Sequence, residues 1–119
     1  MPEVYDLEEA QNLAKSRSKV TVKGRASDQY IVAQGLHGKN RKKNAERDIM
    51  QGIKQLADHL FSHVYNKHGL PCDVYGLPDF KGGDWYVKLH IENGRLIVVS
   101  FHPPKDDILD EEGGKICGP

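Results

Sequence analysis

The chain has 119 residues and a mass of 13.4 kDa, which is enough for one domain and too little for a second hydrophobic core. Hydrophobic residues make up 38% of it, yet no run approaches the roughly 20 apolar residues of a membrane span, so we expect no membrane partner. The N-terminus lacks the basic start and apolar stretch of a signal peptide, so we expect a cytoplasmic protein.

Charge is balanced over the whole chain but not along it. There are 17 basic and 17 acidic side chains. Residues 103–119 hold five acids against two lysines, so this tail carries −3 and residues 1–102 carry +3. A mildly basic body permits an anionic partner such as nucleic acid without requiring one.

Two helices and a short strand are predicted in the first 35 residues. Asp6 and Glu9 have the spacing of a capping box, and the apolar spacing that follows predicts a helix that fades near Arg17. Residues 19–23 alternate Lys-Val-Thr-Val-Lys, which is typical of a short strand. Residues 27–33 favour a second short helix, capped by its first residues.

A basic segment without apolar residues follows, Gly-Lys-Asn-Arg-Lys-Lys at 38–43. Its cations suit contacts with the phosphates of a nucleic acid, and these candidates are Lys39, Arg41, Lys42 and Lys43. The plainer interpretation is a solvated loop that leads into a helix.

The strongest helical pattern covers residues 44–68. It begins at Asn44, a good N-cap, and Gly69 and Pro71 stop it. Its apolar stripe consists of Ile49, Ile53, Leu56, Ala57, Leu60, Phe61 and Val64. His59 and His63 would lie one turn apart, a spacing that suits a metal ion, but no third ligand is near in sequence, so we expect no metal site.

The second half favours strands at 72–75, 85–91 and 95–101, the last two joined by a hairpin turn at Glu92-Asn93-Gly94. A two-residue turn would pair Val87 with Ser100, whereas a three-residue turn would pair Val87 with Val99. We choose the three-residue turn because it gathers the largest apolar residues on one face, namely Trp85, Val87, Leu89, Ile97, Val99 and Phe101. The other face then carries Tyr86, Lys88, His90, Val98, Ser100 and His102.

These elements predict an α+β domain over residues 1–104, with the N-terminal helices packed on one face of a small, twisted antiparallel sheet. Residues 105–119 are acidic and follow Pro103-Pro104. We expect this tail to be disordered. Cys72 and Cys117 are too few for a zinc site without histidine, and the expected compartment disfavours a disulfide between them.

The mixed face combines histidine, tyrosine and lysine, which are the groups that metal-independent RNA cleavage needs. The RNA 2′-OH attacks the adjacent phosphate, so the protein supplies a base, an acid and cations rather than a nucleophile. DNA lacks the 2′-OH and would not be a substrate. The plainer interpretation is a solvated face of the sheet without chemistry.

Three segments carry a resemblance to a known family: Cys-Asp-Val-Tyr at 72–75, Trp-Tyr-Val-Lys-Leu at 85–89 and Leu-Ile-Val-Val-Ser-Phe-His at 96–102. They resemble the C-terminal half of the motility quorum-sensing regulator (MqsR) toxins, RelE-like ribonucleases of type II toxin–antitoxin systems. The resemblance covers mainly residues 72–102 and implies a RelE-like fold, RNA as substrate, mRNA above all, and a cognate antitoxin as protein partner.

The resemblance also implies site residues. The tyrosine of the family's active site falls on Tyr86, its lysine after Ser-Phe on His102, its glutamine before Asp-Val-Tyr on Cys72, and a lysine of the preceding helix at or near His63. Three of the four differ in type, although histidine keeps a group that carries a proton and a positive charge.

The sequence thus predicts a small RNA endonuclease that uses no metal or cofactor. We expect His63 and His102 as general base and acid in either order, and Tyr86 beside the phosphate. Lys88, Arg95 and the four cations of residues 39–43 would hold the RNA backbone. The alternative is a binding module without catalysis, such as an immunity protein or an antitoxin.

Overall fold

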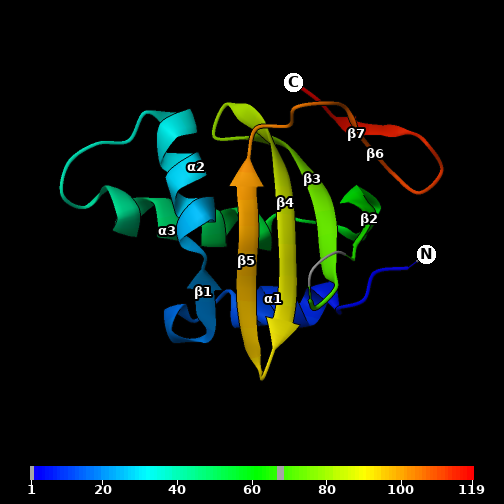
Figure 1. Cartoon of the computed structure of the whole chain (residues 1–119), viewed down its shortest axis with the longest axis horizontal. Helices are drawn as coiled ribbons and strands as arrows, with labels where there is room; N and C mark the ends of the chain where they lie inside the picture. The colour runs from blue at the N-terminus through cyan, green and yellow to red at the C-terminus, as the bar shows by residue number, and fades with distance from the viewer. Residues whose placement is uncertain (1, 67–68) are drawn as a thin grey trace.

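A computed structural model describes residues 2–66 and 69–119 and has α+β architecture, as the sequence predicts (Figure 1). The helices are α1 (Leu7–Leu13), α2 (Gly24–Gln34) and α3 (Arg41–Lys54), with 3₁₀ turns at Arg17–Lys19 and Asp58–Leu60. The strands are β1 (Val20–Val22), β2 (Phe61–Tyr65), β3 (Cys72–Phe80), β4 (Gly83–Glu92), β5 (Arg95–His102), β6 (Ile108–Leu109) and β7 (Lys115–Cys117).

Five strands form one sheet in the order β1-β5-β4-β3-β2, and β6 pairs with β7 in a separate ribbon. The sheet is mixed rather than antiparallel throughout, because β1 runs parallel to β5. The helices cover one face, with α1 and α3 behind the sheet in Figure 1 and α2 along the β5 side. Among the described residues, no helix has the length and apolar character needed to cross a membrane.

The first elements agree with the sequence in kind and differ at their ends. The Asp6 carboxylate caps α1 by accepting a hydrogen bond from the Glu8 backbone N–H at 3.1 Å, and α1 ends before Arg17. α2 begins at Gly24, so Ser27 is not its cap. The Ser27 hydroxyl instead donates to the Gly24 carbonyl one turn back, at 3.0 Å.

The core lies between the helices and the sheet. Tyr30 of α2 is fully buried against the rings of Trp85 and Phe101, with centroids 4.9 and 5.6 Å away. Rings in such offset or tilted contact add to the stabilisation that burial itself provides. The core therefore fixes α2 against β4 and β5.

The helix expected over residues 44–68 is wrong beyond Lys54. α3 starts earlier, at Arg41, and a 3₁₀ turn and β2 follow it. Phe61 and Val64 belong to a strand that pairs with β3, and a bulge between Phe61 and His63 lets Phe61 face the core while His63 faces the other way. Strand pairing thus overrides the helical spacing of these apolar residues. Lys67 and His68, the expected end of the helix, lie outside the described residues.

The predicted hairpin register is also wrong. Glu92 pairs with Arg95, so the turn contains two residues, Asn93 and Gly94. Leu89 then pairs with Val98, but Lys88 pairs with Ser100, because Val99 is an extra residue in β5. This β-bulge shifts the second half of β5 by one position. Leu96, Val98 and Phe101 are therefore the residues of β5 that face the core.

Although the pairing differs, the bulge leaves four of the predicted residues together on the opposite, helix-free face. Past Val99, Tyr86 pairs with His102 and Lys88 with Ser100, so these four side chains share that face as expected. Val98 does not join them, since its side chain lies in the core.

Residues 105–119, for which we expected disorder, lie against the sheet. Ile108 of β6 and Cys117 of β7 are buried, and both approach Gly76 of β3. A methyl group on Gly76 would lie 2.8 Å from Ile116 Cγ2, so the glycine leaves room for the ribbon. The few apolar residues of the tail pack against β3 because Gly76 has no side chain there. The tail sequence by itself does not reveal this space.

Candidate functional site

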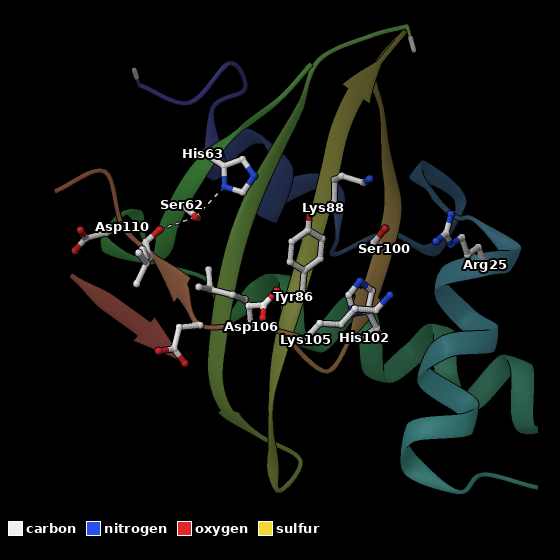
Figure 2. Close-up of a pocket in the computed structure, with 13 residues that line it drawn as sticks. Arg25, Ser62, His63, Tyr86, Lys88, Ser100, His102, Lys105, Asp106 and Asp110 are labelled. Carbon is white, nitrogen blue, oxygen red and sulfur yellow. Dashed lines mark hydrogen bonds between the residues drawn. The ribbon is translucent and has the colours of Figure 1, made fainter. Parts of the chain in front are cut away.

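A cavity of about 540 Å³ opens on the helix-free face, where β2, β4, β5 and the tail meet (Figure 2). Its lining residues are Arg25, Ser62, His63, Tyr86, Lys88, Ser100, His102, Lys105, Asp106, Asp107, Ile108, Leu109 and Asp110. The structure therefore brings the three predicted catalytic residues, His63, Tyr86 and His102, into one cavity together with Lys88.

Tyr86 and His102 form the closest pair in this group. They are partners across β4 and β5, and their rings stack with centroids 4.8 Å apart and planes 15° apart. The His102 ring is held on its other side, because Nδ1 lies 2.8 Å from the Pro103 carbonyl oxygen. A carbonyl only accepts, so Nδ1 carries a proton and Nε2 is the atom that can exchange one.

His63 is oriented by a chain of two hydrogen bonds. The Ser62 hydroxyl donates to the Leu109 carbonyl at 2.5 Å, and its oxygen lies 2.9 Å from His63 Nδ1. Since the hydroxyl proton is used on Leu109, Nδ1 is the donor to Ser62 and Nε2 keeps its lone pair in the neutral ring. The tail thereby fixes the orientation of a predicted catalytic residue.

The two groups next to Lys88 have shifted pKa values. Loss of solvent at the sheet lowers the pKa of His63 from its usual 6.5, and the Lys88 ammonium lowers it further. Burial raises the pKa of Tyr86 above 10, with smaller contributions from Tyr65 and Cys72. At neutral pH the site therefore holds a neutral imidazole beside a protonated phenol.

Lys88 is fixed above another ring. Its Nζ lies 3.9 Å from the centroid of Tyr65, a cation–π contact that holds the charge near the middle of the face. In Figure 2, Lys88 and Tyr86 project from β4 between His63 on the β2 side and His102 on the β5 side. An anion in the cavity would therefore lie near the positive charge of Lys88.

Two further cations line the cavity, and the sequence pattern singles out neither of them. Arg25 comes from the first turn of α2, and Lys105 follows the end of β5. Nothing around Arg25 in the sequence distinguishes it, because its place depends on α2 lying beside β5. Lys105 falls in the tail that we expected to be disordered.

The other predicted RNA contacts lie elsewhere. Arg95 is at the far end of β5, where its Nη1 donates to the Thr21 hydroxyl at 3.3 Å. The four cations of residues 39–43 are exposed at the start of α3 and do not line the cavity. Their expected contact with RNA stays a prediction, and it requires a path longer than the cavity.

Acidic groups of the tail line the cavity too, but two of them are engaged. Asp107 pairs with Lys115 at 3.5 Å. Asp110 Oδ1 accepts hydrogen bonds from the backbone N–H groups of Glu112 and Gly114 at 2.9 and 2.8 Å, which closes the β6–β7 turn. Part of the acidic charge is thus balanced within the tail itself.

Cys72 lies on the same face as Tyr86 but is buried. Its Sγ lies 3.6 Å from His90 Nδ1, and His90 Nε2 lies 3.4 Å from a Glu92 carboxylate oxygen. Burial raises the pKa of the Cys72 thiol, so the thiol form prevails at neutral pH. Cys72 and Cys117 are both free, and neither lines the cavity.

The described part of the chain, residues 2–66 and 69–119, has no group of three or more His, Cys, Asp or Glu side chains that could hold a metal ion. His59 lies in the 3₁₀ turn and His63 in β2, so they do not share a helix. What the cavity does offer is two imidazoles with available Nε2 atoms, a phenol and three cations around one space. Comparison of the chain with profiles of known protein families gives no match, and comparison with curated protein sequences gives none either.

Proposed function

We propose that the protein is a metal-independent RNA endonuclease whose active site is the cavity between β2, β4, β5 and the tail. The observation that carries the proposal is the convergence of His63, Tyr86 and His102 on one space from three strands. Tyr86 and His102 are in direct ring contact, and both histidines have Nδ1 engaged, which leaves Nε2 for proton transfer.

The two histidines divide the proton transfers in this proposal. His63, whose pKa is lowered, is neutral near pH 7 and takes the proton of the 2′-OH on Nε2. The 2′-oxygen bonds to phosphorus, and the bond from phosphorus to the 5′-oxygen of the next nucleotide breaks. His102 acts as the general acid and gives a proton from Nε2 to that 5′-oxygen. The products are a 2′,3′-cyclic phosphate and a 5′-hydroxyl.

Tyr86 and the cations stabilise the charge that builds on the phosphate. The raised pKa of Tyr86 keeps its hydroxyl protonated, so it donates a hydrogen bond to a phosphate oxygen. Lys88, Arg25 and Lys105 surround the same space with positive charge. Because the attacking group is the 2′-OH, DNA binds without being cut.

A role as the toxin of a toxin–antitoxin pair is part of the proposal, with mRNA as substrate and an antitoxin protein as partner. It is supported by the resemblance of residues 72–102 to the RelE-like MqsR toxins. Tyr86, the residue of that pattern that keeps its type, lies at the centre of the cavity.

The alternative is a binding module without catalysis, such as an immunity protein or antitoxin. One observation favours it: Asp106, Asp107 and Asp110 line the same cavity, and carboxylates repel a polyanion while they attract a basic partner. The engagement of Asp107 with Lys115 and of Asp110 with backbone N–H groups reduces that repulsion.

The deciding experiment incubates the purified protein with a long single-stranded RNA in excess EDTA, beside DNA of the same sequence and the double variant His63→Gln/His102→Gln. We expect RNA fragments with 2′,3′-cyclic phosphate and 5′-hydroxyl ends by mass spectrometry, and intact DNA. Cleavage that needs a divalent ion, or that persists in the double variant, would contradict the mechanism. No cleavage by the parent together with capture of a basic protein would favour the binding module.

A further inference from the structure

The Ser62 hydroxyl has one proton and two hydrogen-bond partners. It donates the proton to the Leu109 carbonyl oxygen, which only accepts, and its own oxygen lies 2.9 Å from His63 Nδ1 (Figure 2). Ser62 is 7% exposed, so water has little access to take the place of either partner. The proton between Ser62 and His63 therefore belongs to the imidazole.

This arrangement determines which nitrogen of neutral His63 can accept a proton. A neutral imidazole carries one N–H and one lone pair, and the hydrogen bond at one nitrogen fixes the state of the other. With Nδ1–H donated to Ser62, the lone pair is on Nε2. If Ser62 donated to Nδ1 instead, the ring proton would be on Nε2, and that atom could not act as a base.

The Leu109 carbonyl belongs to the β6–β7 ribbon, residues 108–117, which packs against Gly76 of β3. A methyl group on Gly76 would lie 2.8 Å from Ile116 Cγ2 and 2.9 Å from Cys117 Sγ. The ribbon thus approaches β3 as closely as a glycine permits. Any side chain at this position would push the ribbon, and with it the Leu109 carbonyl, away from the sheet.

The ribbon depends on the sheet for its stability. Two paired strands are marginally stable by themselves, so contacts with the rest of the chain hold β6 and β7 in place. These contacts are the burial of Ile108 and Cys117 and a hydrogen bond of 3.3 Å from the Gly118 N–H to Asp84 Oδ2. Local opening of such a peripheral element requires less free energy than unfolding of the whole chain.

We propose that Ser62 is a positioning residue for the general base, and that the docked ribbon selects the nitrogen of His63 that accepts the proton. The proposal rests on the ribonuclease function, in which His63 takes the 2′-OH proton on Nε2. With the ribbon docked, the Ser62 proton is on Leu109 and Nε2 has its lone pair. With the ribbon displaced, Ser62 is free to donate to Nδ1, and Nε2 no longer accepts. Docking at Gly76 is thereby coupled to catalysis at His63.

The first arm of the test observes the ring proton and needs no RNA. Long-range ¹H–¹⁵N NMR spectra at a pH where His63 is neutral distinguish a protonated from an unprotonated ring nitrogen, and His63→Gln assigns the signals. We expect the Nδ1–H form in the parent and in Ser62→Thr, which keeps a hydroxyl. Ser62→Ala should give a mixture of both forms, and Gly76→Ala a shift towards Nε2–H. Gly83→Ala is the control, because an added methyl group there lies 3.9 Å from its nearest neighbour, Trp85.

The second arm measures RNA cleavage by variants whose thermal melts show that they are folded. Ser62→Ala should lower kcat by roughly 3- to 10-fold, which corresponds to the loss of one hydrogen bond, with KM unchanged. Gly76→Ala should also lower kcat. In Ser62→Ala/Gly76→Ala the two decreases should not multiply, because both act through the same hydrogen bond. Ile108→Ala, which weakens docking without adding a methyl group, should act in the direction of Gly76→Ala.

The two arms separate failure of this proposal from failure of the ribonuclease function. RNA cleavage by the parent, together with the parent tautomer in Ser62→Ala and Gly76→Ala, would overturn the positioning role and leave the ribonuclease in place. The expected tautomers without any RNA cleavage by the parent would support control of His63 by the ribbon and overturn the ribonuclease. Decreases in kcat that multiply in the double variant would overturn the coupling through Ser62.

Discussion

Gly52 of α3 lies so close to Phe101 of β5 that a methyl group on its Cα would stand 2.8 Å from the Phe101 ring carbon Cζ. Glycine within a helix is unfavourable by about 1 kcal/mol relative to alanine, so its presence needs a reason. The reason is the close approach of α3 to the sheet, where Leu77 also leaves no room.

Gly52→Ala should therefore destabilise the protein, although alanine is the better helix former. Overpacking a core costs about 1–3 kcal/mol. The gain in helix propensity from glycine to alanine is about 1 kcal/mol, so over most of that range the cost is larger. The measurement is the free energy of unfolding in urea. Gly24→Ala is the control, because a methyl group at the start of α2 has no atom within 4 Å. Equal stability of both variants would show that α3 lies farther from β5.

The tail should contribute to stability. Ile108→Ala should lower the free energy of unfolding by about 2 kcal/mol, because it leaves a cavity over β3, whereas Leu109→Ala, at a 45% exposed neighbour, should change it by less than about 0.5 kcal/mol. Thermal melts of both variants and of a chain that ends at Pro104 measure this. A truncated chain as stable as the parent would mean that the tail does not pack.

The two faces of the hairpin should respond in opposite ways. His102→Ala should reduce RNA cleavage by roughly 10²- to 10⁴-fold, which is the effect of a lost general acid. It should change the free energy of unfolding by less than about 1 kcal/mol. Tyr86→Phe should also lower activity and keep the ring. Val87→Ala, on the core face, should destabilise by roughly 2 kcal/mol with its folded fraction still active. Stable site variants as active as the parent would remove this face from the mechanism.

Lys88 should control the protonation of His63. Lys88→Met removes a positive charge that lowers the pKa of His63, so that pKa should rise towards 6.5 in an NMR titration of the imidazole. Lys54→Met, at the exposed end of α3, should leave it unchanged. The acidic limb of the pH–rate profile should move up with the pKa, because activity requires neutral His63.

The lowered pKa of His63 also makes the stability of the fold depend on pH. The folded pKa of His63 is below the unfolded one, so between the two values the unfolded chain binds more protons. The contribution of His63 to stability is complete above the unfolded pKa near 6.5 and declines as pH falls through that window. In Lys88→Met this decline should be smaller. An unchanged decline would mean that Lys88 does not act on His63.

The sequence was informative where a local pattern and the tertiary environment agree. Asp6 and the alternation of 19–23 predicted α1 and β1, and Tyr86 was placed on the face of His102. The helix predicted for residues 55–65 was wrong, because their apolar spacing fits a helix and only the pairing of β2 with β3 favours a strand. His63 reached the site from β2 rather than from a helix.

The rest of the site depends on contacts between distant segments. Arg25 lines the cavity because α2 packs along β5, and Ser62 matters because the tail presents the Leu109 carbonyl to it. No spacing in the sequence encodes either relationship. The tail packs because Gly76, some 30 residues earlier in the chain, has no side chain there.

The extra residue at Val99 makes β5 a strand with two phases. Before the bulge the even-numbered residues Leu96 and Val98 point into the core, and after it the odd-numbered Phe101 does. If Val99 were paired as an ordinary residue of the ladder instead of bulging, each residue after it would exchange faces, so that His102 would enter the core and Phe101 the cavity. A hairpin of this length that is transplanted to another scaffold therefore keeps its active face only when the bulge forms there, whereas a hairpin without Val99 would keep the same face as a regular ladder.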